Sequence, residues 1–92
     1  MATGTATMNF GAATGGVHEA SVDVTGQSGL SGASYIEAFD MAEATANHTA
    51  DDVRVDRAVF VCEFLTASSF RIHGHPMIGR IWGDRSVRWV TA

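Results

Sequence analysis

The chain has 92 residues and a formal net charge of −4, and a chain of this length forms one domain with a thin core. All six basic residues are arginine, and an acidic chain without a basic patch argues against nucleic-acid binding. The single cysteine, Cys62, excludes a disulfide within the chain, which leaves oligomerisation as the simplest additional source of stability. The N-terminus lacks the pattern of a signal peptide and no apolar run reaches the length of a membrane span, so we expect a cytoplasmic product without a membrane partner.

The first half of the chain predicts three strands separated by glycine-rich turns. In TATMNFG, residues 5–11, small polar residues alternate with Met8 and Phe10, which is the period of a half-buried strand. The clearest strand signal is EASVDVTG, residues 19–26, where alanine and valine alternate with polar residues. The segment SYIEAFDMAEA, residues 34–44, fits a strand or a helix, and the turn signals before it favour a strand.

The second half begins with the most apolar run of the chain and then alternates again. The continuous pattern of RAVFVCEFL, residues 57–65, predicts a central strand covered on both faces. A further strand is predicted for FRIHGH, residues 70–75, and two short ones for residues 79–83 and 86–92, on either side of a Gly-Asp turn. The core candidates in the apolar run are Val59, Val61, Phe64 and Leu65.

Six or seven short strands with glycine-rich connections predict an all-β fold, a small antiparallel sandwich or barrel. Residues 1–92 form the single domain, with residues 1–4 as a candidate flexible N-terminal arm. In the last strand Val87 and Trp89 share one face while Arg88 lies on the other, so we expect the tryptophan inside and the arginine outside. This strand must be paired, because unpaired chain ends fray.

Candidate chemistry is sparse. His73 and His75 share a face if they lie on a strand, and imidazole is a common metal ligand, but a site needs further donors and these two are weak candidates. Cys62 lies inside the apolar run, where a free cysteine behaves as a small hydrophobe. None of the common nucleophile, phosphate-loop or metalloprotease motifs occurs, so we expect neither an enzyme nor a cofactor.

The segments GTATMNFG, EASVDVTGQSG, SYIEAFDMAEATANHTADD and SVRWV together resemble a family of small virion structural proteins of tailed bacteriophages. Members of that family combine a GTATxxFG start, a VTGQ turn, a DHTADE-like loop and a VRWVW-like closing strand. This chain differs in NHTADD at residues 47–52 and in its VTA ending, and its segment RIHGHPMIGRIWG has no counterpart in that pattern.

The resemblance implies a particle protein, and a many-copy accessory subunit agrees with a small, acidic, lysine-free domain. The expected function is that of a head decoration or accessory protein, made in the bacterial host cytoplasm and located in the virion. We expect a symmetric homo-oligomer, a trimer, that covers its sheet edges and docks on the major capsid protein. Outward arginines are enriched at interfaces, and the candidate contact residues are Arg54, Arg57, Arg80, Arg85 and Arg88.

The alternative is a carbohydrate-binding role in host attachment. Residues 51–64, 68–75 and 85–92 are faintly similar to small β-sandwich lectins, which would place the chain on a tail fibre or vertex appendage. A sugar site needs an aromatic face beside hydrogen-bonding groups. The alternative therefore predicts an exposed cluster of Trp82, His73, His75 and Arg80.

Overall fold

A computed structural model describes residues 2–11, 19–32, 34–41, 45, 58–76 and 81–92 of the chain. These residues contain six β-strands, and no helix occurs among them. The strands are β1 (Ala2–Asn9), β2 (Ala20–Val24), β3 (Ile36–Asp40), β4 (Ala58–Thr66), β5 (Ser69–Pro76) and β6 (Asp84–Thr91).

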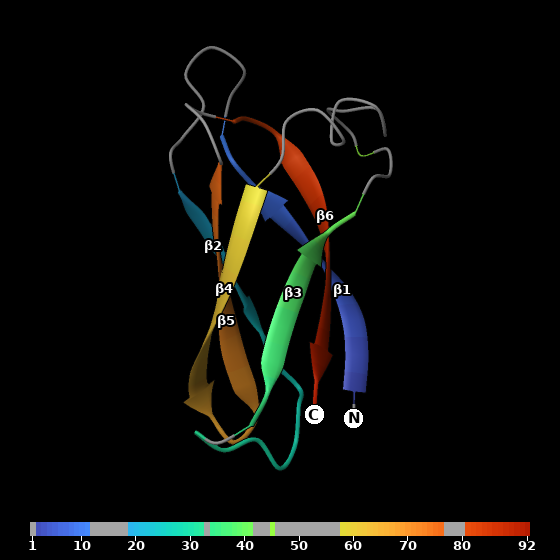
Figure 1. The fold of residues 1–92 in the computed structure, drawn as a ribbon, viewed down its shortest axis with the longest axis vertical. Coiled ribbons are helices and arrows are strands. Elements are labelled where there is room, and N and C mark those ends of the chain that lie inside the picture. Colours follow the sequence, from blue (N-terminus) through green and yellow to red (C-terminus); the bar gives the residue numbers. More distant parts are fainter. Residues whose placement is uncertain (1, 12–18, 33, 42–44, 46–57, 77–80) are drawn as a thin grey trace.

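The strands form two three-stranded antiparallel sheets, which confirms the predicted all-β fold (Figure 1). One sheet has the order β1-β6-β3 and the other the order β2-β5-β4. The last strand, β6, is therefore the centre of its sheet, held by β1 on one side and β3 on the other. The two sheets face each other, and their edge strands β3 and β4 lie side by side and run in opposite directions (Figure 1).

The core lies between the sheets. It is built from the inward-facing apolar residues of β1, β5 and β6, together with apolar residues of the connecting segments. Met8 and Phe10 are fully buried, as their spacing predicts, and Trp89 is only 6% exposed. The Trp89 and Phe70 rings meet edge to face with centroids 5.3 Å apart, an arrangement that adds about 0.5–1.5 kcal/mol beyond area burial. The buried apolar residues are Met8, Phe10, Leu30, Phe70, Ile72, Ile81, Val87 and Trp89.

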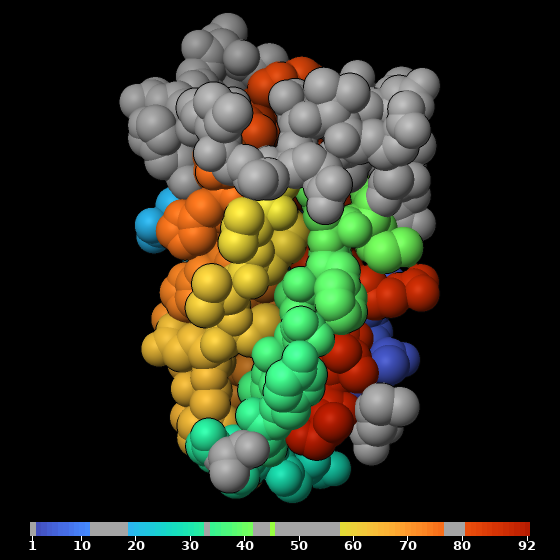
Figure 2. Space-filling view, in the orientation of Figure 1, coloured from blue at the N-terminus to red at the C-terminus, as the bar shows by residue number. Residues whose placement is uncertain are grey.

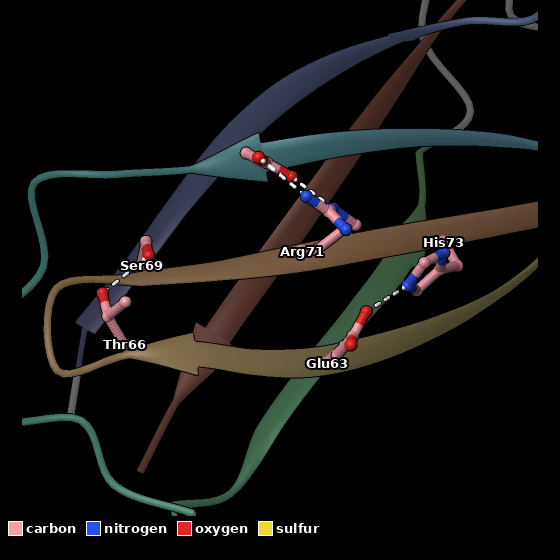
Figure 3. Close-up of polar contacts among 6 residues, drawn as sticks. Glu63, Thr66, Ser69, Arg71 and His73 are labelled. Atoms are coloured by element: carbon pink, nitrogen blue, oxygen red, sulfur yellow. Dashed lines mark hydrogen bonds and ion pairs between the residues drawn. The ribbon is translucent and has the colours of Figure 1, made fainter.

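Two short connections set the ends of the strands. Gly83 has a φ of 77°, a backbone conformation that glycine adopts without strain, and it confirms the predicted turn before β6. The amide of Phe10 donates to the carbonyl of Gly83 at 2.8 Å. At the other end β4 and β5 form a hairpin, where the Thr66 and Ser69 hydroxyls are hydrogen-bonded at 2.8 Å (Figure 3).

The structure corrects two predictions. Strand β4 is an edge strand and not a central one, and Val59, Val61 and Phe64 are 49%, 56% and 39% exposed. Both faces of β4 are apolar, so its composition alone did not show that the alternate set, which includes Phe60, packs inward. Residues 2–4 are not an arm, because they pair with β6 as part of β1. Of the strand predicted at residues 79–83, residues 79 and 80 lie outside the described residues, and residues 81–83 form no continuous strand.

Candidate interaction surface

Exposed apolar side chains gather along the two neighbouring edge strands β3 and β4. All five large apolar side chains that the described residues leave exposed lie on or directly beside these strands. We call this set, Tyr35, Phe39, Val59, Val61 and Phe64, the β3–β4 strip. The space-filling view shows β3 and β4 next to each other along one face of the molecule (Figure 2).

Strand alternation explains why these side chains point outward. On β3 the intermediate positions Ile36 and Ala38 pack against the core, so Phe39 and its neighbours of the same parity face solvent. On β4 Phe60 and Cys62 pack inward, which turns Val59 and Val61 outward. Phe64 lies where the β4–β5 register shifts, and its side chain is exposed near the end of the strand.

On the outer face of the sheet that contains β4, charged side chains form pairs within the chain. The Arg71 guanidinium on β5 donates to both carboxylate oxygens of Asp23 on β2, at 2.7 and 3.3 Å. This hydrogen bond holds the pKa of Asp23 below its usual value of 3.8 and raises the pKa of Arg71. The pair joins the edge strand β2 to the centre of its sheet and is exposed to solvent.

Two similar pairs involve the carboxylates of β4 and β3, the strands that carry the strip. His73 on β5 and Glu63 on β4 are hydrogen-bonded through Nε2 and Oε1 at 2.7 Å (Figure 3). At the end of the strip the Tyr35 hydroxyl donates to Glu37 Oε2 at 2.8 Å, which raises the pKa of Tyr35. The carboxylates that border the strip therefore already have partners.

The histidine pair is arranged as predicted, with both side chains on one face of a strand. His73 and His75 are two residues apart on β5 and share one face of the strand, opposite the face of the buried Phe70 and Ile72. His75 Nδ1 lies 4.0 Å from Glu19 Oε2, and His73 contacts Glu63. Within the described residues no group of three or more histidine, cysteine or carboxylate side chains could hold a metal ion.

Three of the four residues of the candidate sugar site lie in the described part of the chain. His73 and His75 are on the outer face of β5, while Trp82 is half-buried in the segment that leads into β6. Arg80 lies outside the described residues.

The five candidate contact arginines divide into three groups. Arg54, Arg57 and Arg80 lie outside the described residues. Arg88 is exposed on β6 and pairs in register with Phe39, so it borders the β3–β4 strip. Arg85 is fully buried, and its prediction as an outward contact residue is wrong.

Arg85 instead forms a buried ion pair that sequence reasoning missed. Its Nη1 lies 3.6 Å from Oδ2 of Asp40, whose side chain is 7% exposed. Asp40 stands opposite Val87 on β6, so the two charged residues are diagonal neighbours on the inner face of one sheet. Arg85 shares the parity of Val87 and Trp89, and this signal was present in the sequence.

Cys62 is half-buried and packs against the core. Burial raises the pKa of its thiol to about 11, with a smaller contribution from the charge of Glu37. The thiol is therefore protonated at neutral pH, which makes it a poor nucleophile.

Comparisons with protein-family models, with curated proteins and with solved structures find no match to this chain. None of the described residues belongs to a helix long and apolar enough to cross a membrane.

Proposed function

We propose that this protein is a non-catalytic structural subunit of a tailed-bacteriophage particle. In this role it is a head decoration or accessory protein that forms a symmetric homo-oligomer, a trimer, and docks on the major capsid protein. Its function is then to bind proteins, through surfaces that the two sheets hold rigid.

The β3–β4 strip is the observation that carries this proposal. An aromatic side chain presents about 150–250 Å², so five roughly half-exposed large side chains leave on the order of 400 Å² of apolar surface. A patch of that size equals the largest found on typical monomers, where it often serves binding. Because the strip lies along paired strands and not on a loop, it suits a preorganised protein interface.

The polar groups around the strip support binding over catalysis. Glu63 and Glu37 are each hydrogen-bonded to a neighbour in the same chain, and Asp23, farther away on β2, is paired in the same way. Among the described residues, these polar side chains form separate pairs across the sheet surface. They do not converge on one point where a substrate atom could sit. Such a surface can lose water without leaving these carboxylates unpartnered.

The particle location rests on the sequence. The segments GTATMNFG, EASVDVTGQSG and SVRWV carry the resemblance to small virion proteins, and the structure places all three in or beside strands of the two sheets. The chain is acidic and contains no lysine, which favours contact with proteins over contact with nucleic acid.

The test is to count copies of this chain in purified particles of a phage that encodes it, by quantitative peptide mass spectrometry. A ratio to the major capsid protein near one, or a simple fraction of it, supports a head decoration protein. A handful of copies contradicts that location and favours a tail or vertex appendage, with sugar binding as the next function to test on a glycan array. Absence from the particles overturns the virion role.

A further inference from the structure

The β3–β4 strip needs a partner of defined chemistry. Tyr35 and Val61 are 58% and 56% exposed, whereas core residues of the same sandwich such as Phe70 are fully buried. A chain of this size gains little stability from its own core, so covering an apolar strip of this extent is favourable.

The charges around the strip restrict that partner. The nearest carboxylates, Glu37 and Glu63, are hydrogen-bonded to Tyr35 and His73 of the same chain. A basic partner would therefore have to compete with pairs that already exist. An apolar partner whose own carboxylates are already paired meets no such competition, and another copy of this chain offers such a surface, with the exposed Arg88 at its border.

The shape of the molecule favours an arrangement of several copies about one axis. The protein measures 39 × 21 × 19 Å, so its cross-section is nearly round, and its strands follow the long dimension (Figure 1). A round rod makes only a narrow contact with a single neighbour, whereas a stable interface buries about 800 Å² on each partner. In a trimer each rod contacts two neighbours, which roughly doubles the surface that it buries.

We infer that the β3–β4 strip is covered by other copies of this chain, in a trimer whose strips face a common three-fold axis parallel to the strands. The inference rests on the proposed function and deepens it, because it assigns the strip to self-association and leaves other surfaces for the capsid. Val59, Val61 and Phe39 form the apolar centre of this contact, and Arg88 lies at its border.

The inference is tested by the mass of the full chain in solution. Size-exclusion chromatography with light scattering should give about three times the 9.7 kDa of one chain. Val61→Glu places three carboxylates near the axis and should weaken association about 100-fold or more. Thr7→Glu adds the same charge at an exposed position of β1, opposite the neutral Ser86, and should leave the trimer intact.

A second variant and a check of folding keep the test decisive. Phe39→Ser removes an exposed aromatic ring without adding charge and should also weaken association, and far-ultraviolet circular dichroism should show that both variants keep the wild-type β spectrum. A wild-type chain that stays monomeric at its highest soluble concentration overturns the inference, as does a two-chain mass or an equal mass for the Val61 and Thr7 variants. If the chain is counted in particles but is monomeric in solution, the inference fails and the virion role stands. If it is trimeric through the strip but absent from particles, only the virion role fails.

Discussion

Removing one half of the buried Arg85–Asp40 pair should destabilise the protein far more than removing both halves. At 3.6 Å two unit charges attract by about 5 kcal/mol when the effective dielectric constant is about 20. Burying the two ions costs several kcal/mol for each, so the intact pair contributes little net stability. The guanidinium cannot lose its proton, and its nitrogens make no hydrogen bond to the described part of the chain.

We therefore expect Asp40→Ala to lower the free energy of unfolding by about 3–5 kcal/mol, because it leaves the Arg85 charge buried without a counterion. A domain of this size has a total stability of roughly 5–15 kcal/mol, so the variant loses a large part of it. The matched control is the double variant Asp40→Val with Arg85→Met, which replaces both charges with apolar groups. It should lie within about 1 kcal/mol of the wild type or above it.

Urea unfolding at a fixed chain concentration measures all three proteins. With a slope of about 1–3 kcal/mol per molar urea, a loss of this size moves the midpoint by roughly 2 M. The chain concentration must be held constant, because self-association adds stability that depends on it. The reasoning is refuted if Asp40→Ala unfolds within about 1 kcal/mol of the wild type, or if the double variant is no more stable than Asp40→Ala.

Three further predictions concern packing, reactivity and pH. A Cβ atom at Gly4 would lie 2.7 Å from Cε2 of Trp89, so Gly4→Ala should lower the free energy of unfolding in urea by about 1–3 kcal/mol. Gly32→Ala, with open space around it, should lower this free energy much less, and equal losses would contradict the packing. Because the pKa of Cys62 is about 11 in place of 9.0, its thiol should react with a disulfide reagent roughly 100-fold more slowly in the folded chain than in urea at the same pH, and equal rates would show an accessible thiolate. The pKa of Asp23 is lowered on folding, so its contribution to stability is present above pH 3.8 and is lost as the pH falls through the lowered value. The difference in stability between the wild type and Asp23→Asn should therefore shrink in acid. A difference that does not change with pH would contradict the pairing.

Strands with polar and apolar residues in strict alternation could be predicted together with their faces. In β2 and β5 the charged Asp23 and Arg71 mark the outer face, and Val22 and Ile72 mark the inner one. The same rule correctly placed Trp89 inside and Arg88 outside. In these strands local sequence determines which side packs, because only one face can be buried without burying a charge.

In strand β4 the alternation rule could not predict which face packs inward. Its residues Val59, Phe60, Val61 and Cys62 are all apolar, so either face could have packed inward. The inner face follows from the register of the β4–β5 hairpin, which sets Cys62 opposite the buried Ile72. The β3–β4 strip also needs the contact between β3 and β4, which are far apart in the sequence, so it could not be assembled from sequence alone.

The outward position predicted for Arg85 was wrong for a different reason. The parity of β6 placed it on the same face as Val87 and Trp89, but its charge favoured an outward position. The structure keeps the parity and supplies Asp40 from the neighbouring strand as counterion. An arginine at a core parity position can thus be recognised from sequence, whereas the partner that makes it tolerable comes from the sheet topology.

We expect the β3–β4 strip to be buried when the protein assembles. Hydroxyl-radical footprinting measures this burial by comparing the labelling of the assembled protein with that of the dilute monomer. Tyr35, Phe39 and Phe64 should be strongly protected in the assembly, whereas Trp89 should be labelled weakly in both states because it is already in the core. Equal labelling of the three strip residues in both states, with protection elsewhere on the surface, would show that assembly does not bury the strip.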